Sequence, residues 1–308
     1  MGQLVDGRWH VGWYEPDARG EFRRPDTRFR DRSVQVTAGR YHLYAAWACP
    51  WAHRTLITRA LRGLTDAVSV TIVDPHMGDD GWKFRPDDPD PVGGARLLSE
   101  IYLRANGAYT GRVTVPILWD KEAKTIVNNE SREVMRILDV DFAPLAKDPM
   151  EPSLAPPHLI DQIERVLDAI YSPINNGVYR AGFATSQDAY ASAANELFAA
   201  LGHWDAVLAD QPFVCGSQMT EADIALFTTL LRFDLVYYAH FKCNMKRLRD
   251  HANLWRFTRR MYQHPGIQPT CQLEDIKTHY YWSQSTVNPT RIVPLGPSSL
   301  EVELTAPV

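Results

Sequence analysis

The residues of this chain that are best suited to chemistry surround one cysteine, Cys49. They form the run Ala46-Trp47-Ala48-Cys49-Pro50-Trp51-Ala52-His53-Arg54-Thr55. An apolar stretch typical of a β-strand (41–45) precedes this run, and apolar residues at helical spacing follow it as far as Gly63. At a strand-to-helix turn, free backbone N–H groups and the positive end of the helix favour a thiolate. The sequence therefore predicts a reactive thiol at Cys49 rather than a buried structural cysteine.

Cys49 has no second cysteine at the spacing of a dithiol redox pair, because position 52 is alanine. A lone nucleophilic thiolate needs an external thiol to complete a redox cycle. Glutathione is the abundant thiol of the cytosol, so we expect it to act as the co-substrate.

A second feature is Val115-Pro116, within an apolar run that ends at Asp120. Proline is confined to the starts and edges of strands, so this position predicts the entry to a strand. Two interpretations stay open: an ordinary trans-proline, or a cis-proline that faces the cysteine of the first helix. In the second case the backbone of Val115 would hydrogen-bond a peptide ligand as an added strand does.

A third feature is Asn129-Glu130-Ser131, at the start of a predicted helix. Free N–H groups and a hydroxyl at that position suit the carboxylate of a ligand, and an acidic side chain suits a free α-amino group. These residues would thus recognise the amino-acid end of a ligand. The alternative is an ordinary helix cap.

Composition and charge exclude several classes of protein. The chain has 308 residues, a net charge of −4 and 45% hydrophobic residues, which suits about two domains with a sizeable core. The mild charge argues against a nucleic-acid binder, and no apolar run is long enough to cross a membrane. The N-terminus lacks a signal-peptide pattern, and the 4 scattered cysteines form no disulfide framework. We therefore expect a cytoplasmic protein with no nucleic-acid or membrane partner.

The first half of the chain predicts an arm followed by an α/β domain. Residues 1–37 contain many arginines with interleaved acids, typical of a solvated arm that wraps the body. Residues 38–145 alternate strand and helix signals in the order βαβ–ββα, apart from a loop insertion from Asp74 to about Gly94. That order predicts a mixed sheet with helices packed on it.

The second half predicts a helical domain and a tail. After a proline-rich linker (143–157), residues 155–282 follow helical periodicity. Thr220-Glu221-Ala222-Asp223 has the form of a capping box, with aspartate in place of the usual glutamate. The proline- and serine-rich segment 283–308 predicts an extended tail.

Together these features resemble a glutathione transferase and, within that superfamily, the glutathionyl-hydroquinone reductases, also called the Xi class. Besides the Cys49 run, the motifs that carry the resemblance are Gly81-Trp82, Gly111-Arg112-Val113-Thr114-Val115-Pro116-Ile117-Leu118-Trp119-Asp120, Asn129-Glu130-Ser131, Asn176-Gly177-Val178-Tyr179-Arg180-Ala181-Gly182-Phe183-Ala184, Arg232-Phe233-Asp234, Tyr237, His240-Phe241-Lys242-Cys243, His279-Tyr280-Tyr281 and Asn288-Pro289-Thr290. The resemblance implies an α/β thioredoxin-like N-terminal domain that binds glutathione. It also implies an all-α C-terminal glutathione-transferase domain that binds the second substrate.

The resemblance also implies roles for individual residues. Cys49 is expected to be the nucleophile. The residues expected to bind glutathione are Trp82, Arg112, Val115, Glu130 and Ser131. Val115 would bind through its backbone, whereas Arg112 and Trp82 would contribute charge and packing.

Three tyrosines are expected to line the second-substrate pocket: Tyr179, Tyr237 and Tyr280, with Tyr281 as the alternative to Tyr280. Trp282 follows this pair where the family pattern suggests a smaller residue, so it would reshape the edge of the site. The hydroxyls of Tyr179, Tyr237 and Tyr280 would bond the hydroquinone oxygens and favour the tautomer that accepts a proton.

The implied reaction is the glutathione-dependent reduction of glutathionyl-hydroquinones through a Cys49–glutathione mixed disulfide, with release of oxidised glutathione. The family also implies a homodimer. A broader thioltransferase or dehydroascorbate reductase stays open, as does a non-catalytic scaffold with the transferase fold. His240 and Cys243 resemble half of a metal site, but the sequence offers no second pair, so we predict no metal.

Overall fold

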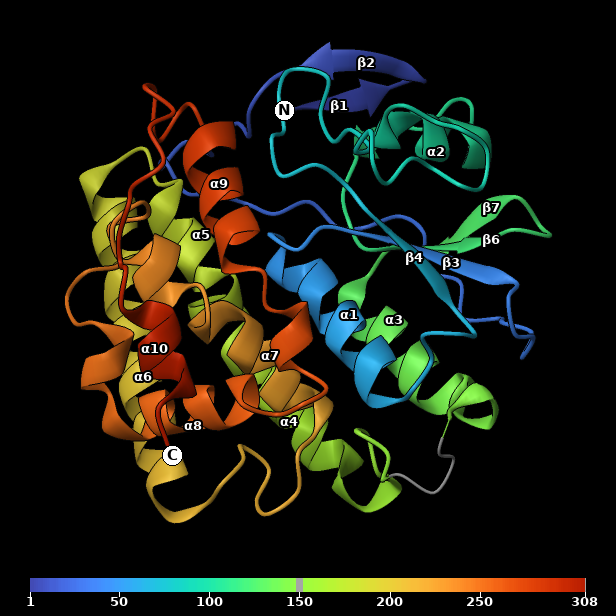
Figure 1. The fold of residues 1–308 in the computed structure, drawn as a ribbon. Coiled ribbons are helices and arrows are strands. Elements are labelled where there is room, and N and C mark those ends of the chain that lie inside the picture. Colours follow the sequence, from blue (N-terminus) through green and yellow to red (C-terminus); the bar gives the residue numbers. More distant parts are fainter. Residues whose placement is uncertain (148–151, 308) are drawn as a thin grey trace. The chain divides into compact units, whose positions relative to one another are not determined.

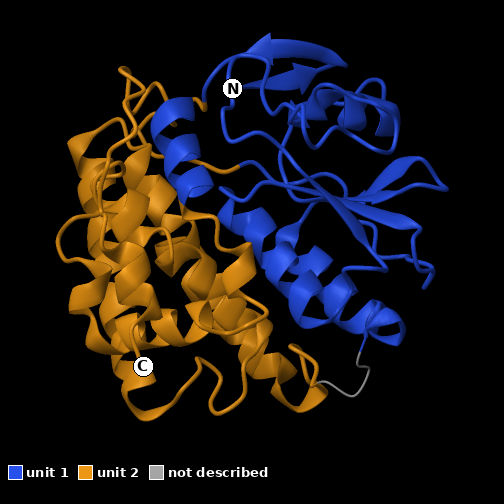
Figure 2. Cartoon of the chain, viewed as in Figure 1, with its two compact units in different colours: residues 1–13, 25–151, 274–283 blue, residues 14–24, 152–273, 284–308 orange. Residues whose placement is uncertain are grey.

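The computed structural model describes residues 1–147 and 152–307, and the chain forms two compact units (Figure 2). Unit 1 contains residues 1–13, 25–151 and 274–283. Unit 2 contains residues 14–24, 152–273 and 284–308. Residues 14–24 of the arm belong to unit 2, whereas the rest of the arm belongs to unit 1. Residues 274–283 also belong to unit 1, although the predicted boundaries assign 274–282 to the helical domain.

A four-stranded sheet forms the centre of unit 1, in the order β4-β3-β6-β7 (Figure 1). Its strands are β3 (Tyr41–Ala45), β4 (Ser69–Ile72), β6 (Ile117–Asp120) and β7 (Thr125–Asn128). Leu43 pairs with Val70 in the parallel β3–β4 pair and with Leu118 in the antiparallel β3–β6 pair. A parallel pair needs a crossover connection, and the helix that begins after Cys49 provides it. The predicted mixed sheet is confirmed.

Helices cover both faces of this sheet. They are α1 (Pro50–Leu61), α2 (Leu98–Ala105) and α3 (Ser131–Arg136), which continues as a π-helical turn over Ile137–Asp141. In Figure 1, α1 and α3 lie on one face and α2 on the other. In α2, apolar residues at helical spacing face the core: Leu98, Ile101 and Tyr102 are all buried.

The sequence-based prediction missed two elements of unit 1, the N-terminal hairpin and α2. Residues 1–37 are not wholly a solvated arm, because β1 (Gly2–Val5) and β2 (Arg8–Val11) form a hairpin that pairs with β5 (Gly111–Arg112). Asp6 and Gly7 both have positive φ, 46° and 75°, as a tight hairpin turn requires. This Asp-Gly pair is a sequence signal for a hairpin turn. The helical spacing of apolar residues over 98–105 was an equally available signal for α2.

Unit 2 is helical, as predicted. Its helices are α4 (Ile160–Ile170), α5 (Gly177–Gly182), α6 (Gln187–Asp210), α7 (Glu221–Leu230), α8 (Ala252–Tyr262) and α10 (Leu300–Thr305), whereas nearly all of α9 (Leu273–Ser283) belongs to unit 1. π-helical turns occupy Tyr171–Asn175 and Phe233–Tyr237. Short 3-10 turns of this unit occupy Pro157–Leu159, Leu248–Asp250 and Gln268–Thr270, whereas the turn at Ala143–Leu145 belongs to unit 1. Every residue of α7 is buried, so α7 is the central helix of this unit.

The predicted capping box at the start of α7 is confirmed. The Asp223 carboxylate accepts hydrogen bonds from the Thr220 N–H at 2.8 Å and from the Thr220 hydroxyl at 2.9 Å. It also accepts one from the Val214 N–H at 2.8 Å. Burial nevertheless raises the pKa of Asp223 to about 6.

The C-terminal tail is not extended throughout. Leu300 and Leu304 are four residues apart and both buried, and this spacing forms the short helix α10 within the tail. Of the predicted linker at 143–157, residues 148–151 lie outside the described part of the chain.

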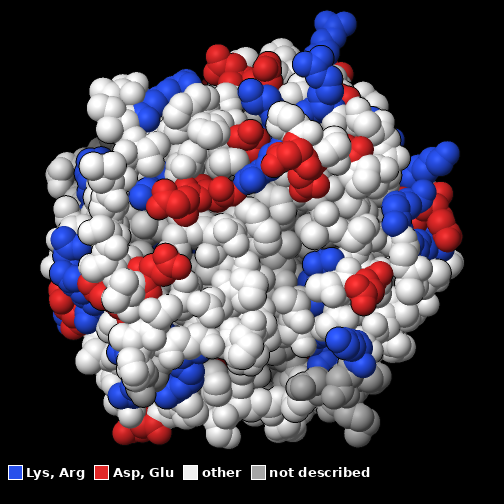
Figure 3. Space-filling view, viewed as in Figure 1, with Lys and Arg blue, Asp and Glu red and all other residues white. Residues whose placement is uncertain are grey.

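The surface agrees with the small net charge of the sequence. On the face drawn in Figure 3, acidic and basic side chains lie next to one another. Within residues 1–147 and 152–307, no helix is both long and apolar enough to span a membrane.

Candidate active site

Cys49 lies at the turn that the sequence predicts. It is the N-cap residue of α1, with extended backbone angles (φ −78°, ψ 119°), and its carbonyl oxygen accepts the His53 N–H at 2.9 Å. The side chain is half-buried, and Sγ lies 3.6 Å from the carbonyl oxygen of Val115. The first helical position is Pro50, which needs no hydrogen-bond acceptor for its nitrogen. The sulfur therefore combines partial exposure with the positive end of a helix.

The other three cysteines have a different environment. Cys215, Cys243 and Cys271 are buried. Burial raises the pKa of Cys215 to about 11 and those of Cys243 and Cys271 to about 12. These thiols stay protonated at neutral pH, so Cys49 is the cysteine whose position suits nucleophilic chemistry.

The peptide bond between Val115 and Pro116 is cis, which decides between the two interpretations of the sequence. Pairing between β3 and β6 begins at Tyr44 and Ile117, so Val115 lies just outside the paired strands. Its backbone stands beside the sulfur of Cys49 at the end of a sheet. This is a position where a peptide ligand can add main-chain hydrogen bonds.

Glu130 and Ser131 lie together at the start of α3. Glu130 is the N-cap residue, and its carboxylate accepts the Arg132 N–H at 3.3 Å and the Thr27 hydroxyl at 3.2 Å. The Ser131 hydroxyl donates to the same carboxylate at 3.5 Å. The role of helix cap and the role of ligand recognition are therefore compatible with one another. Glu130 caps the helix, and its side chain remains half-exposed.

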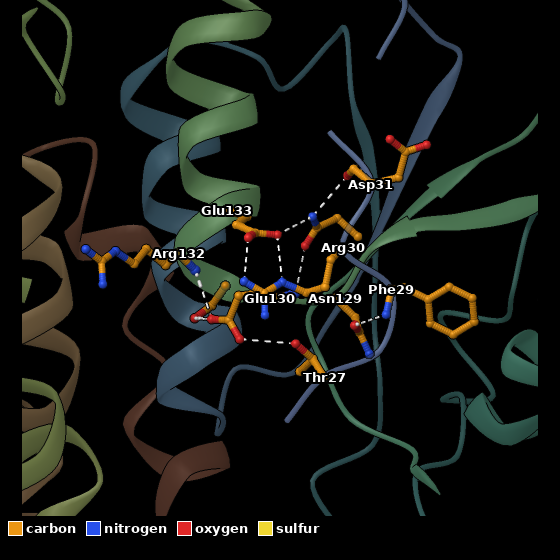
Figure 4. Close-up of polar contacts among 10 residues, drawn as sticks. Thr27, Phe29, Arg30, Asp31, Asn129, Glu130, Arg132 and Glu133 are labelled. Atoms are coloured by element: carbon orange, nitrogen blue, oxygen red, sulfur yellow. Dashed lines mark hydrogen bonds and ion pairs between the residues drawn. The ribbon is translucent and has the colours of Figure 1, made fainter. Parts of the chain in front are cut away.

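Part of the N-terminal arm holds this segment from outside (Figure 4). The Phe29 N–H donates to Oδ1 of Asn129 at 3.2 Å, and the Phe29 carbonyl accepts the Asn129 N–H at 3.0 Å. Arg30 donates to Glu133 at 2.9 Å, and this bond holds the pKa of Glu133 below its usual value. The arm thus fixes the loop on which Glu130 sits, rather than remaining a solvated chain.

Trp82 and Arg112 lie on other parts of unit 1. The buried Trp82 ring stacks on His279 of α9, with ring centroids 4.6 Å apart and planes at 16°. The Arg112 guanidinium donates to the carbonyl oxygens of Gly2, Gly12 and Trp13, at 3.2, 2.9 and 2.7 Å. In this structure, the charge of Arg112 therefore helps to hold the N-terminal segment.

The predicted tyrosines divide between the units. Tyr179 of α5 and Tyr237 of the π-helical turn belong to unit 2 and meet with ring centroids 6.1 Å apart at 61°. Phe241 stacks on Tyr237 at 5.4 Å and 10°. Tyr237 is fully buried and Tyr179 is 8% exposed, so both rings belong to an aromatic cluster.

Tyr280 belongs to unit 1, on α9. It is 1% exposed and packs at 5.6 Å and 78° against His279, the residue that also stacks on Trp82. Tyr281 is 8% exposed, and burial raises its pKa. Because both tyrosines are buried, exposure does not decide between them. The next residue, Trp282, meets the His76 ring edge-on at 5.0 Å.

One residue near this site was absent from the sequence-based prediction. Arg54 is only 4% exposed, its guanidinium donates to the Ser131 hydroxyl at 3.5 Å, and it lies 4.4 Å from the centre of the Trp51 ring. The available signal was a charged residue within the apolar pattern of α1, five residues after Cys49.

His240 and Cys243 do not form a metal site with the other described residues. The Nε2 atom of His240 lies 3.0 Å from Oε1 of Gln284, and burial lowers the pKa of His240 to about 4. Across the part of the chain that the structure describes, no group of three or more His, Cys, Asp or Glu side chains is arranged to hold a metal ion.

Known proteins resemble this chain over both units. Family models described as the N-terminal and C-terminal domains of glutathione S-transferase match residues 48–140 and 187–260. The glutathionyl-hydroquinone reductase PcpF of Sphingobium chlorophenolicum is 46% identical over 305 residues, which cover 97% of this chain and 97% of PcpF.

Solved structures show the same relationship. A Xi-class glutathione transferase from Natrialba magadii is 48% identical with a TM-score of 0.92, and the match covers 100% of this chain and 96% of that one. The glutathione-bound structure of YqjG from Escherichia coli K-12 is 42% identical with a TM-score of 0.86, covering 96% of each chain. The fold, the cysteine at the start of α1 and these similarities agree: the chain belongs to the glutathione transferase superfamily and, within it, to the glutathionyl-hydroquinone reductases of the Xi class.

Proposed function

We propose that this chain reduces glutathionyl-hydroquinones to hydroquinones, with glutathione as co-substrate and Cys49 as nucleophile. One observation carries the proposal: a half-buried thiol at the N-cap of α1, with Sγ 3.6 Å from the Val115 carbonyl that precedes the cis-proline. The 46% identity with a glutathionyl-hydroquinone reductase supports the substrate class.

In the first half-reaction, the Cys49 thiolate attacks the sulfur of the glutathionyl group. A disulfide bond forms between Cys49 and glutathione, and the bond from that sulfur to the aromatic carbon breaks. The bonding electrons stay on the carbon, which takes a proton and leaves as the hydroquinone. The helix N-terminus favours the thiolate that starts this step.

In the second half-reaction, the thiolate of another glutathione attacks the mixed disulfide. Oxidised glutathione leaves, and Cys49 returns to the thiolate form. One glutathionyl-hydroquinone and one glutathione thus give one hydroquinone and one oxidised glutathione. Glutathione is a consumed reductant in this cycle, and no metal takes part.

Residues of unit 1 would bind glutathione. The backbone of Val115 would pair with the peptide part of the ligand next to Cys49. The Glu130 carboxylate would bind the α-ammonium group, and the Ser131 hydroxyl the neighbouring carboxylate. Trp82 would contribute packing, and Arg112 of β5 would contribute charge. The glutathione-bound structure of YqjG supports glutathione as the ligand.

Tyrosine hydroxyls would act on the aromatic part of the substrate. Tyr179, Tyr237 and Tyr280 would donate hydrogen bonds to the hydroquinone oxygens and favour the tautomer whose carbon accepts the proton. In this proposal residues 38–145 form the glutathione domain and residues 155–282 the second-substrate domain. We further propose that the protein is a homodimer in the cytoplasm. Light scattering after size-exclusion chromatography would test the dimer by its mass.

Turnover on two substrates tests the function. The purified protein is assayed with a glutathionyl-hydroquinone and with a small glutathione mixed disulfide, at equal glutathione concentration. The proposal expects faster turnover of the glutathionyl-hydroquinone. Activity on the mixed disulfide alone would instead identify a thioltransferase. A Cys49 that alkylates no faster than free cysteine at neutral pH, without turnover of either substrate, would identify a scaffold.

A further inference from the structure

Residues 14–24 of the N-terminal arm are built into unit 2 (Figure 2). Phe22 packs edge-on against Tyr14 at 5.0 Å and against Phe183, just after α5, at 5.2 Å. The Gly20 carbonyl oxygen accepts the Thr185 N–H at 3.0 Å. This part of the arm is therefore anchored beside the helix that carries Tyr179.

A turn within the arm gives two adjacent arginines opposite environments. The Asp17 carboxylate accepts the N–H groups of Arg19 and Glu21, at 2.9 and 3.0 Å, and closes the turn. Arg23 pairs with Asp17 at 2.9 Å, and 75% of its side chain is exposed. Arg24 is half-buried and lies against α5.

The Arg24 guanidinium contacts α5 in two ways. Its Nε donates to Oδ1 of Asn176, the N-cap residue of α5, at 2.9 Å. Its Cζ atom lies 4.7 Å from the centre of the Tyr179 ring. The Tyr179 N–H also donates to the Asn176 carbonyl at 3.0 Å, so both contacts act on one turn of helix.

A guanidinium over a phenol ring has an electrostatic consequence. The positive charge is attracted to the electron-rich face of the ring. The attraction grows as the hydroxyl gives up its proton or shares it in a hydrogen bond, because the ring then carries more negative charge. The cation thereby strengthens the hydroxyl as a hydrogen-bond donor and limits rotation of the ring.

We propose that Arg24 is a positioning residue for Tyr179, through which the N-terminal arm promotes release of the hydroquinone. This inference rests on the proposed function, because it acts through the hydrogen bond from Tyr179 to the substrate. It assigns a role in the reaction to an arginine of the arm that lies outside the family motifs named above.

The first test compares Arg24→Met with Arg23→Met in the full-length protein. Arg24→Met should lower kcat/KM for a glutathionyl-hydroquinone about 5- to 30-fold, the range expected for loss of a partly desolvated cation–π contact. Reduction of a small glutathione mixed disulfide should stay within about 2-fold of the wild type. Arg23→Met, which removes an exposed charge from the same turn, should leave both activities unchanged.

The second test separates an electrostatic role from a purely structural one. Arg24→Lys keeps the charge, so it should recover most of the lost activity. In the Arg24→Met protein, the alkaline limb of the pH–rate profile should move upward by about 0.5 to 1 pH unit. In a Tyr179→Phe background, Arg24→Met should cause little additional loss, because its effect passes through the phenol hydroxyl.

The outcomes distinguish the two proposals. A wild-type protein without activity on glutathionyl-hydroquinones would contradict the proposed function and, with it, this inference. An active wild type with an equally active Arg24→Met variant would overturn the inference alone. Equal losses on both substrates, or additive losses in the Tyr179→Phe background, would reduce Arg24 to a structural residue. If Arg24→Met does not fold, Arg24→Gln takes its place, with Arg23→Gln as the control: a loss confined to the glutathionyl-hydroquinone supports the role, and activity equal to that of Arg23→Gln contradicts it.

Discussion

The two units prepare their predicted site residues by different physical means. In unit 1, Cys49, Val115 and Glu130 lie where a strand or helix begins, and main-chain groups surround them. In unit 2, Tyr179 and Tyr237 lie in an aromatic cluster with Phe183 and Phe241. Thiol chemistry needs a local electrostatic field, which a helix end supplies. Recognition of an aromatic substrate needs a shaped apolar surface, which only packing supplies.

This contrast makes distinct predictions for the two units. Changes at Cys49, Val115 or Glu130 of unit 1 should affect both substrates, because every substrate of a Cys49 enzyme passes through the mixed disulfide. Changes to the tyrosines should affect the aromatic substrate most.

The largest effect is expected for Cys49→Ser. A serine hydroxyl is a far weaker nucleophile near neutral pH, so kcat/KM should fall at least about 10³-fold on both the glutathionyl-hydroquinone and the mixed disulfide. Folding and glutathione binding should be largely intact, as checked by circular dichroism and calorimetry. The matched control is Cys215→Ala, which removes a buried thiol and should keep full specific activity. Activity that survives Cys49→Ser would refute the covalent mechanism.

Tyr237→Phe should separate the two substrates. Loss of one phenol hydroxyl should lower the rate of hydroquinone release about 10- to 100-fold, since a hydrogen bond that strengthens during reaction is lost. Reduction of the mixed disulfide should change far less. Tyr262→Phe is the control, because Tyr262 is also buried in unit 2 but lies on α8. Steady-state kinetics on both substrates measure the effect, and equal losses would argue against a proton-transfer role for Tyr237.

Glu130→Gln should weaken glutathione binding in unit 1. Removal of the charge from a hydrogen bond to an ammonium group should raise KM for glutathione about 10-fold with a smaller change in kcat. Glu122→Gln is the control, because that side chain is 62% exposed and pairs with Arg40 away from α3. Isothermal titration with glutathione provides a direct measurement. Unchanged affinity would show that Glu130 serves only as a helix cap.

Acid should destabilise unit 1 more than unit 2, and this is the smallest effect we predict. Burial lowers the pKa of His42 in unit 1 and of His240 in unit 2 from 6.5 to about 4. The unfolded chain therefore binds more protons between these values, and stability falls as the pH drops from 6.5 toward 4. In unit 2 the raised pKa of Asp223, about 6, opposes this trend, because protonation below that pH relieves its buried charge.

Hydrogen exchange at pH 6.5 and 4.5, corrected for intrinsic rates, measures the acid effect for each unit. The opening free energy of β3 should fall by about 1–2 kcal/mol more than that of α7. His42→Gln should reduce the pH dependence of β3. A larger acid effect on α7 would contradict this assignment of the buried charges.

The sequence predicted several local features of the molecule, although it missed the β1–β2 hairpin and α2, and it did not predict the features that depend on distant contacts. The turn at Cys49 and the Thr220–Asp223 capping box were predictable, because neighbouring residues determine them. The sequence left open whether the Val115–Pro116 peptide bond is cis or trans, and the structure shows that it is cis. The contact between Arg24 and Asn176 joins residues 152 positions apart, and no spacing rule predicts it. Family resemblance, rather than spacing, supplied the tyrosines, and only the structure assigned Tyr280 to unit 1.

Peptide mass spectrometry after a single half-reaction tests the central claim most directly. The protein is incubated with a glutathionyl-hydroquinone in the absence of added glutathione, quenched with acid and digested. The account predicts one glutathione on the peptide that contains Cys49, in an amount equal to the hydroquinone released, and its removal when glutathione is added. Released hydroquinone with an unmodified Cys49, or an adduct on Cys215, Cys243 or Cys271 instead, would contradict it.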